Sequence, residues 1–256
     1  MTILAIDFGG TQVKSALVSE DFVLAKSLPT QSSPQTLDQA LDVIDHLVTS
    51  IEVALSGIAI SVPGTVDTEE GVIYYGGLLR FFHGFRVKET LQAKYHLPVA
   101  ALNDGKAAAL AELATGHLQG VTNGAALVLG SGLGGGIIIN GRLFQGSHFQ
   151  AGELTFLLPL QMEKIDPSLM RGTTLSAVGL ITKVNEILAS PDLKDGLLAF
   201  KAINAKKEAV YQIFETYCRN LAITILNLQT IFDMETFVLG GGISAQPILI
   251  EEVNRQ

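Results

Sequence analysis

Cysteine is almost absent from this sequence of 256 residues, and its one cysteine, Cys218, has no partner for an internal disulfide. A zinc site built from several cysteines is excluded for the same reason. Such low cysteine usage is typical of proteins from a reducing compartment. We therefore expect a cytoplasmic protein without disulfides.

Charged residues are also scarce, at 16% of the chain against about 25% in typical soluble domains. Lys and Arg number 17 and Asp and Glu 25, which gives a net charge of −8. Because nucleic-acid-binding surfaces are usually basic, this balance argues against a nucleic-acid partner. A hydrophobic content of 48% is too high for a disordered chain and allows a large buried core.

A long uninterrupted apolar run is missing as well. The most apolar stretch, residues 125–139, contains five glycines and is shorter than the roughly 20 residues of a membrane-spanning helix. The N-terminal apolar run lacks a preceding basic segment and is interrupted by Asp7, unlike a signal peptide. We therefore expect no membrane association.

Apolar strand patterns alternate with helical patterns along the chain, which predicts an α/β fold. Strands are predicted at residues 2–7, 13–18, 57–62, 72–75, 98–102, 125–129, 137–140 and 236–239, and helices at 36–55, 87–95, 106–113, 174–189, 196–203, 206–230 and 247–253. One strand–turn–strand pattern occurs twice, at residues 4–11 and 126–133. This repeat indicates two related domains with a boundary in residues 105–122.

Glycine is abundant, with 26 residues, and much of it gathers in three clusters that each follow a predicted strand. The first cluster, in residues 7–12, forms either an ordinary hairpin turn or a nest of backbone N–H groups that binds an anion. In the second, Gly130, Gly132 and Gly135 match a dinucleotide fingerprint, but a strand pattern follows where that site needs a helix. A phosphate nest fits this turn better. The third, residues 240–242, would let a nucleoside lie flat against backbone.

Three acidic or amide side chains stand at informative places. Asn103 and Asp104 end a predicted strand and begin a predicted helix, where both residue types serve as N-caps. A carboxylate held there is also able to accept a proton from a substrate hydroxyl. Glu153 follows a glycine in an apolar stretch, and it is either a solvated loop acid or a ligand-binding residue.

Taken together and in this order, the segments resemble the motifs of the ROK family of sugar kinases. They are DFGGT at residues 7–11, VPGTVD at 62–67, LNDGKAAALAE at 102–112, LGSGLGGGIIING at 129–141, AGE at 151–153 and LGGGIS at 239–244. Each motif alone is weakly specific, whereas the ordered set covers nearly the whole chain.

The resemblance implies a two-domain, actin-like ATPase (ribonuclease H-like) α/β fold with a ligand cleft between residues 1–112 and residues 113–256. It implies a kinase that transfers the γ-phosphate of ATP to a hydroxyl, the 6-OH, of a hexose or β-glucoside. Asp104 would be the catalytic base, with Gly64, Asn103 and Glu153 as further sugar ligands. The resemblance assigns ATP and Mg²⁺ to Asp7, Gly9, Gly10, Thr11, Gln12, Gly130, Ser131, Gly132, Gly241 and Gly242, with Asp7 holding the metal through water.

Some positions depart from the family pattern. Phe156 stands where many members have the His of a Glu-x-x-His element, and residues 164–174 contain no cysteine, so we expect no structural zinc. Ser176 replaces a further family Glu. Gln12 replaces a frequent Lys, whose charge Lys106 would at most partly restore.

Aromatic side chains near the motifs favour a larger or more apolar-faced substrate, such as a β-glucoside or a disaccharide. The candidates are Phe81, Phe82, Phe85 and Phe156. Glucose is not excluded by this pattern.

Two other function classes stay open. A catalytically inactive sugar-binding sensor would carry the same sugar motifs, although ROK repressors need an N-terminal helix-turn-helix for which the residues before Asp7 leave no room. An NAD-dependent oxidoreductase is disfavoured by the strand pattern after Gly136. The resemblance also leads us to expect a homodimer. Because family members usually extend well beyond the last glycine motif, we expect a truncated C-terminal end.

Overall fold

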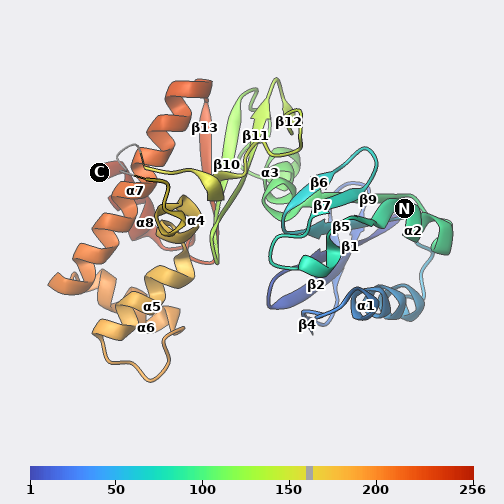
Figure 1. The fold of residues 1–256 in the computed structure, drawn as a ribbon, viewed down its shortest axis with the longest axis horizontal. Helices are drawn as coiled ribbons and strands as arrows, with labels where there is room; N and C mark the ends of the chain where they lie inside the picture. The colour runs from blue at the N-terminus through green and yellow to red at the C-terminus, as the bar shows by residue number, and fades with distance from the viewer. Residues whose placement is uncertain (160–163) are drawn as a thin grey trace. The chain divides into compact units, whose positions relative to one another are not determined.

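The computed structural model describes residues 1–159 and 164–256, and the chain forms two compact units (Figure 1). Unit 1 comprises Met1–Ala107 and Gln145–Ala151, and unit 2 comprises Ala108–Phe144 and Gly152–Gln256. The division differs from the predicted one at residue 112, because it runs through helix α3 (Asp104–Thr115) and assigns residues 145–151 to unit 1. Hydrogen bonds from Lys106 to Phe149 and from Gln145 to Thr68 tie that segment to unit 1.

Unit 1 is built on a six-stranded sheet with the order β3–β2–β1–β5–β9, in which β4 also pairs with β2. The strands are β1 (Thr2–Phe8), β2 (Gln12–Ser19), β3 (Leu24–Ser27), β4 (Gln31–Ser32), β5 (Gly57–Val62) and β9 (Val99–Asn103). β1 and β2 form an antiparallel hairpin, whereas β1, β5 and β9 run parallel. The carboxyl ends of these three strands therefore meet at one edge of the sheet, where α/β folds bind ligands.

Two helices and a small second sheet complete unit 1. Helix α1 (Leu37–Ser50) begins after Thr36, whose hydroxyl accepts a hydrogen bond from the N–H of Gln39. It ends before the predicted residue 55, because Ile51 is already extended. Helix α2 (Val87–Tyr95) matches its prediction. The second sheet has the order β6 (Thr65–Asp67), β7 (Val72–Tyr75) and β8 (Phe85–Arg86), with the short helix η1 (Arg80–Phe82) between β7 and β8.

Unit 2 repeats the hairpin of unit 1 in a four-stranded sheet with the order β12–β11–β10–β13. The strands are β10 (Gly124–Leu129), β11 (Leu133–Ile139), β12 (Arg142–Phe144) and β13 (Thr236–Gly241). β10 and β11 are antiparallel, and β10 pairs in parallel with β13, as β1 pairs with β5. The structure thus confirms the repeated strand–turn–strand pattern.

The helices of unit 2 pack around a large apolar core. They are η2 (Leu154–Phe156), η3 (Pro167–Leu169), α4 (Arg171–Thr174), α5 (Ala177–Ile187), α6 (Gly196–Asn204), α7 (Glu208–Phe232) and α8 (Pro247–Arg255). Phe214, Cys218 and Leu221 recur along one face of α7 and are fully buried, as helical spacing predicts. Cys218 is thus a core residue, and its burial raises the pKa of the thiol to about 12.

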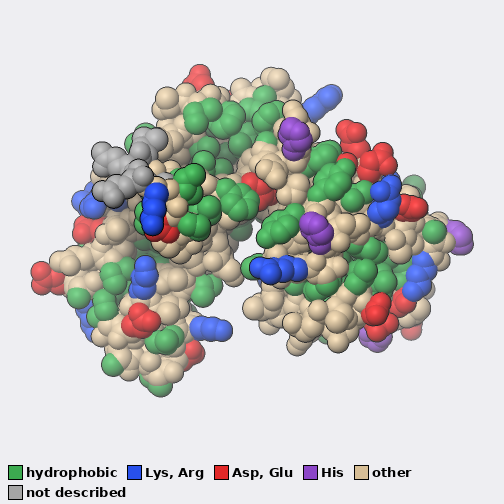
Figure 2. All heavy atoms as spheres, in the orientation of Figure 1, with side chains coloured by type: hydrophobic (Ala, Val, Ile, Leu, Met, Phe, Trp, Pro, Cys, Tyr) green, Lys and Arg blue, Asp and Glu red, His purple; other side chains and the backbone are tan. Residues whose placement is uncertain are grey.

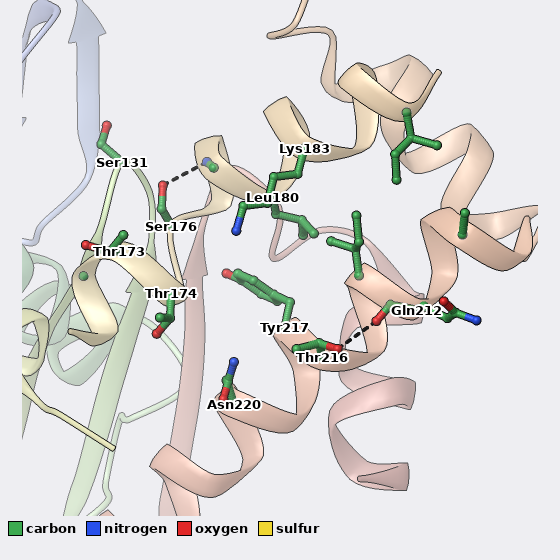
Figure 3. Close-up of a pocket in the computed structure, with 15 residues that line it drawn as sticks. Ser131, Thr173, Thr174, Ser176, Leu180, Lys183, Gln212, Thr216, Tyr217 and Asn220 are labelled. Carbon is green, nitrogen blue, oxygen red and sulfur yellow. Dashed lines mark hydrogen bonds between the residues drawn. The ribbon is translucent and has the colours of Figure 1, made fainter. Parts of the chain in front are cut away.

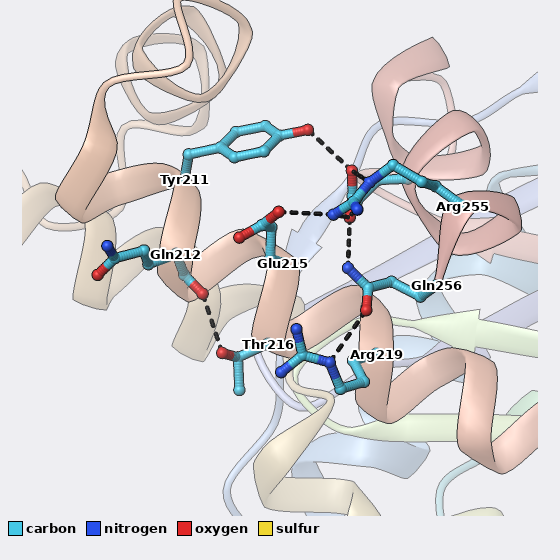
Figure 4. A network of polar contacts seen from close by, with 8 residues as sticks. Tyr211, Gln212, Glu215, Thr216, Arg219, Arg255 and Gln256 are labelled. Carbon is cyan, nitrogen blue, oxygen red and sulfur yellow. Dashed lines mark hydrogen bonds and ion pairs between the residues drawn. The ribbon is translucent and has the colours of Figure 1, made fainter.

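A polar network fastens α8 to α7 (Figure 4). Glu252 is buried, and its carboxylate accepts hydrogen bonds from Tyr211 at 2.8 Å and from Nε of Arg255 at 2.9 Å. Arg255 also forms an ion pair with Glu215 at 2.5 Å. These contacts hold the pKa of Glu252 at about 2, with the Arg255 hydrogen bonds as the main cause.

Charged side chains are scattered among apolar and uncharged surface on the face that Figure 2 shows. Within residues 1–159 and 164–256, none of the helices combines the length and the apolar character needed to cross a bilayer.

Candidate functional site

The first glycine turn connects β1 to β2. The N–H of Gly9 donates to the carbonyl of Gln12 at 2.9 Å, and the hydroxyl of Ser33 donates to the carbonyl of Gly9 at 2.8 Å. Gly10, Thr11 and Gln12 are exposed. The turn is therefore held from both sides while its tip is accessible to a ligand.

Asp7 lies near the end of β1, at the edge where the parallel strands finish. Its register partner on β5 is Ser61, whose hydroxyl donates to Oδ1 of Asp7 at 2.6 Å. The carboxylate is half-buried and has a fixed orientation. One oriented carboxylate fits Mg²⁺, which takes one or two protein carboxylates and keeps several waters.

Asn103 joins two of the predicted sugar-binding segments. Its side-chain amide donates to the carbonyl of Gly64 at 2.9 Å, and its side-chain oxygen accepts from the N–H of Lys106 at 3.0 Å. The second bond caps α3, so the N-cap interpretation is confirmed. Asn103 is only 5% exposed, so its two bonds lock the start of α3 onto the turn at Gly64.

Gly64 occupies a position that only glycine fits. Its φ is +98°, and a Cβ atom there would lie 1.9 Å from the carbonyl oxygen of Tyr75. The backbone of β7 therefore packs directly against this turn.

Asp104 is the first residue of α3 and is accessible to solvent. Desolvation by the surrounding protein raises the pKa of its carboxyl above the usual value, and the charge of Asp7 raises it further. The hydrogen bond from the N–H of Gly105, at 2.8 Å, opposes that rise and fixes Oδ1. A carboxylate with a raised pKa binds a proton more readily, as a general base requires.

The second and third glycine clusters lie side by side in unit 2. In the parallel pair of β10 and β13, Gly241 is the register partner of Leu129, which directly precedes Gly130. The N–H of Gly130 donates to the carbonyl of Gly132 at 3.0 Å, and Gly242 is exposed. β11 begins at Leu133, so the strand continues where a dinucleotide-binding turn would need a helix.

A cavity of about 720 Å³ opens beside the second turn in unit 2 (Figure 3). Side chains of α5, such as Lys183, and of α7, such as Gln212 and Asn220, line it together with Ser131. Among the described residues that line it, neither Gly241 nor Gly242 is present. Its size is typical of a pocket for a small molecule or cofactor.

One of the departures from the family pattern, Ser176, has a structural role in unit 2. Ser176 caps α5, because its hydroxyl accepts from the N–H of Gly179 at 2.9 Å, and it lines the unit 2 cavity. The carbonyl of Gly130 accepts from the N–H of Ala177 at 2.9 Å, which places the second turn at the start of α5. Phe156 is exposed at the end of η2. Glu153 is half-buried directly before η2, and its role as a sugar ligand stays a prediction.

Lys106, which was expected at most partly to restore the charge of a lysine at position 12, is buried in the structure. The side chain is 1% exposed, and its ammonium donates to the carbonyl of Phe149. Lys106 therefore fixes the 145–151 segment to α3.

Three of the four phenylalanines that were expected to favour a larger or more apolar-faced substrate belong instead to the core. Phe82 is 1% exposed and meets Phe8 edge-on, with ring centroids 5.3 Å apart. Phe81 and Phe85 pack against the same core. Sequence alone does not show which aromatic residues of one segment turn inward.

Sequence reasoning missed Tyr74 and Tyr75, whose side chains are about half exposed beside a second cavity. Two consecutive tyrosines just before Gly76 and Gly77 are the signal that was available. Both side chains belong to the lining of that cavity, together with Thr65 and residues 147–150.

The histidines give no metal site in the described part of the chain, where no group of three or more His, Cys, Asp or Glu has a metal-binding arrangement. His83, His117 and His148 are exposed. The expected absence of structural zinc stays a prediction.

The sequence is similar to a known protein family over nearly its whole length. The model of the ROK family matches residues 3–256. A beta-glucoside kinase of Listeria innocua is 31% identical over 257 residues, covering 99% of this chain and 86% of that protein.

Two solved structures are similar over the full chain. A ROK family protein from Streptococcus pneumoniae in complex with sucrose has a TM-score of 0.84 at 34% identity, with 85% of that chain covered. A ROK family glucokinase from Streptomyces griseus in complex with glucose and AMPPNP has a TM-score of 0.84 at 22% identity, with 88% covered, and shows likeness of fold alone.

Proposed function

The chain belongs to the ROK family, and we propose that, as an ATP-dependent carbohydrate kinase, it transfers the γ-phosphate of ATP to the 6-OH of a hexose or β-glucoside. The β-glucoside alternative is supported by the beta-glucoside kinase relative. Membership of the family does not by itself identify the sugar that accepts the phosphate.

The arrangement around Asn103 carries the proposal. Asn103 binds the carbonyl of Gly64 and caps the helix that Asp104 begins, so three predicted sugar-site residues form one fixed group. Phosphoryl transfer needs positioned groups more than covalent chemistry. A rigid carboxylate with a raised pKa meets that need.

Asp104 accepts the proton of the sugar hydroxyl in the proposed reaction. The hydroxyl oxygen forms a bond to the γ-phosphorus while the bond between that phosphorus and the bridging oxygen of ADP breaks. The proton ends on the Asp104 carboxylate, and the products are ADP and the sugar phosphate. Gly64 and Asn103 orient the acceptor, and Glu153 is a further ligand by family resemblance.

Asp7 is the residue that would hold Mg²⁺, through water. The bound ion would supply positive charge against the phosphate oxygens. Ser61 keeps the Asp7 carboxylate oriented for this task. The tip of the first turn, at Gly10, Thr11 and Gln12, offers backbone N–H groups and a hydroxyl to a phosphate.

The nucleotide binds in unit 2 under this proposal. Ser131 connects the second glycine turn to the 720 Å³ cavity, which is large enough for a base and ribose. Lys183 supplies a positive charge on its wall, and Gln212 and Asn220 supply amides that suit a heterocyclic base. Gly241 and Gly242 lie beside the second turn and outside the lining of this cavity, and the family resemblance assigns them to the nucleotide.

A coupled assay of ADP release over a panel of hexoses and β-glucosides tests the function. We expect ATP- and Mg²⁺-dependent turnover with at least one sugar of the panel and none without sugar. Phosphorus NMR of the product then identifies the hydroxyl that was phosphorylated. Absence of turnover with every sugar would leave a sugar-binding sensor as the better explanation.

A further inference from the structure

A second cavity, of about 390 Å³, lies within unit 1. It is lined by Thr65 of β6, by Tyr74 and Tyr75 of β7, and by residues 147–150 of the 145–151 segment. None of the proposed catalytic or phosphate-binding steps uses this space. A cavity of this size accommodates one sugar ring with its hydration.

The cavity begins where the proposed sugar site ends. Thr65 directly follows Gly64, and the carbonyl of Tyr75 is the atom that leaves no room for a side chain at Gly64. The carbonyl of Gly64 in turn accepts a hydrogen bond from the side chain of Asn103, which directly precedes Asp104. A ligand held at Gly64 and Asn103 thus has the cavity directly beside it.

The aromatic side chains of the cavity have the character of a sugar-stacking platform. Tyr74 is 49% exposed and Tyr75 48%, although both are large apolar rings. The Tyr74 ring lies 6.3 Å from that of Phe149, and its hydroxyl donates to Asp67 at 3.2 Å, which fixes the ring. Fixed aromatic rings with polar edges suit a ligand that is apolar on one face and polar at its rim.

The remaining lining residues favour a neutral polar ligand over an anion. Ser147, His148 and Gln150 are exposed at the cavity and offer donors and acceptors, and its described lining contains no Lys, Arg, Asp or Glu. A phosphate group would find no fixed cation there. A second sugar ring, with its hydroxyls and its apolar C–H face, matches both parts of this lining.

Two hydrogen bonds hold the segment of residues 145–151, which forms one wall of the cavity. The buried Lys106 donates to the carbonyl of Phe149, and Gln145 donates to Thr68 of the hairpin between β6 and β7. These hydrogen bonds hold one wall of the cavity in place, so a ligand that binds there orders little additional chain.

We propose that this cavity is the subsite for the second ring of a β-linked disaccharide, whose first ring is held by Gly64, Asn103 and Asp104. The inference rests on the proposed sugar kinase function and adds where the aglycone binds. Tyr74 and Tyr75 are then the residues that set the preference for a disaccharide over a monosaccharide.

The ratio of kcat/KM for cellobiose to kcat/KM for glucose tests this subsite in the full chain. For Tyr74→Ala and Tyr75→Ala we expect this ratio to fall at least about fivefold, because a stacked aromatic ring is lost from the second-ring site alone. Tyr74→Phe keeps the ring and should keep the ratio. Phe22→Ala removes an exposed aromatic elsewhere in unit 1 and should also leave the ratio unchanged.

Three outcomes would overturn the subsite. One is a wild-type chain that phosphorylates glucose but not cellobiose, another is an unchanged ratio in both alanine variants, and the third is an equal loss with both sugars. Each differs from failure of the sugar kinase function itself, which would show as no turnover of any sugar by the wild-type chain. That result would remove the subsite together with the function on which it rests.

Discussion

The side-chain amide of Asn103 donates a hydrogen bond of 2.9 Å to the main-chain carbonyl of Gly64. The two residues are far apart in the sequence, at the end of β9 and before β6, and this bond makes them one site. Because Asn103 also caps α3, the same side chain links Gly64 to the start of the helix that carries Asp104.

Gly64→Ala is expected to destabilise the fold and to impair sugar binding. The alanine would have to adopt φ of +98° and would clash with the carbonyl of Tyr75. Gly84 has φ of +75° but open space around it, so Gly84→Ala pays only for the left-handed backbone. We expect unfolding in urea to show a cost of about 1–3 kcal/mol for Gly84→Ala and a larger cost for Gly64→Ala. Equal costs would mean that the Tyr75 contact relaxes freely.

Some of this site follows from the sequence, because its parts are local. The strand pattern up to Leu102 and the helical pattern after Lys106 place Asn103 and Asp104 at a strand-to-helix junction, and the N-cap bond is a contact within four residues. The twin hairpins were likewise visible as a repeat. Patterns of this kind depend only on neighbours in the chain.

The rest depends on contacts between distant segments. Phe82 and Tyr75 are close in the sequence, yet Phe82 enters the core against Phe8 while Tyr75 stays half exposed. Which of the two side chains is buried depends on the turn at Gly76 and Gly77 and on the pairing of β7. The local pattern of hydrophobic residues predicts neither feature. A lysine on a helix is usually exposed, and the sequence around Lys106 does not indicate otherwise. Its contact with Phe149 depends on the fold, because the two residues are distant in the sequence.

Lys106→Met is expected to loosen the 145–151 segment. The substitution keeps the buried volume but removes the ammonium that holds the Phe149 carbonyl, at a cost of about 1.5–3 kcal/mol for a charged hydrogen bond. We expect faster amide hydrogen exchange in residues 145–151. The exposed Lys14→Met serves as the control and should leave exchange in that segment as in the wild type. Unchanged exchange in Lys106→Met would show that other contacts hold the segment.

The Glu252 network gives the folding stability a defined dependence on pH. The folded-state pKa of about 2 lies below the ordinary value of 4.5. The ionised carboxylate therefore contributes its full stabilisation above about pH 4.5, and this contribution is lost as the pH falls from 4.5 towards 2. We expect Glu252→Gln to lower the free energy of unfolding at pH 7 and to flatten its fall in acid.

The neighbouring Glu251 is exposed and provides a matched control. Glu251→Gln should follow the wild-type curve of unfolding free energy against pH. A Glu252→Gln curve that also follows the wild type would show that the network in Figure 4 contributes nothing to stability.

The raised pKa of Asp104 should be visible in the pH profile of the kinase. A general base works only when deprotonated, so kcat/KM should fall as the pH drops through the pKa of Asp104 in the free enzyme. Because desolvation and the charge of Asp7 raise that pKa, we expect the acid limb above the ordinary carboxyl range near 4. An acid limb below that range would assign the limb to another group.

The turnover of Asp104→Asn, measured beside its affinity for the sugar, tests the central claim most directly. Asn keeps the size of the side chain and removes the base, so we predict a loss in kcat of about 10²–10⁴-fold with a sugar dissociation constant close to that of the wild type. Asp38→Asn, an exposed acid on α1, should retain full turnover. An Asp104→Asn chain that turns over as fast as the wild type would contradict the role of Asp104 as the base.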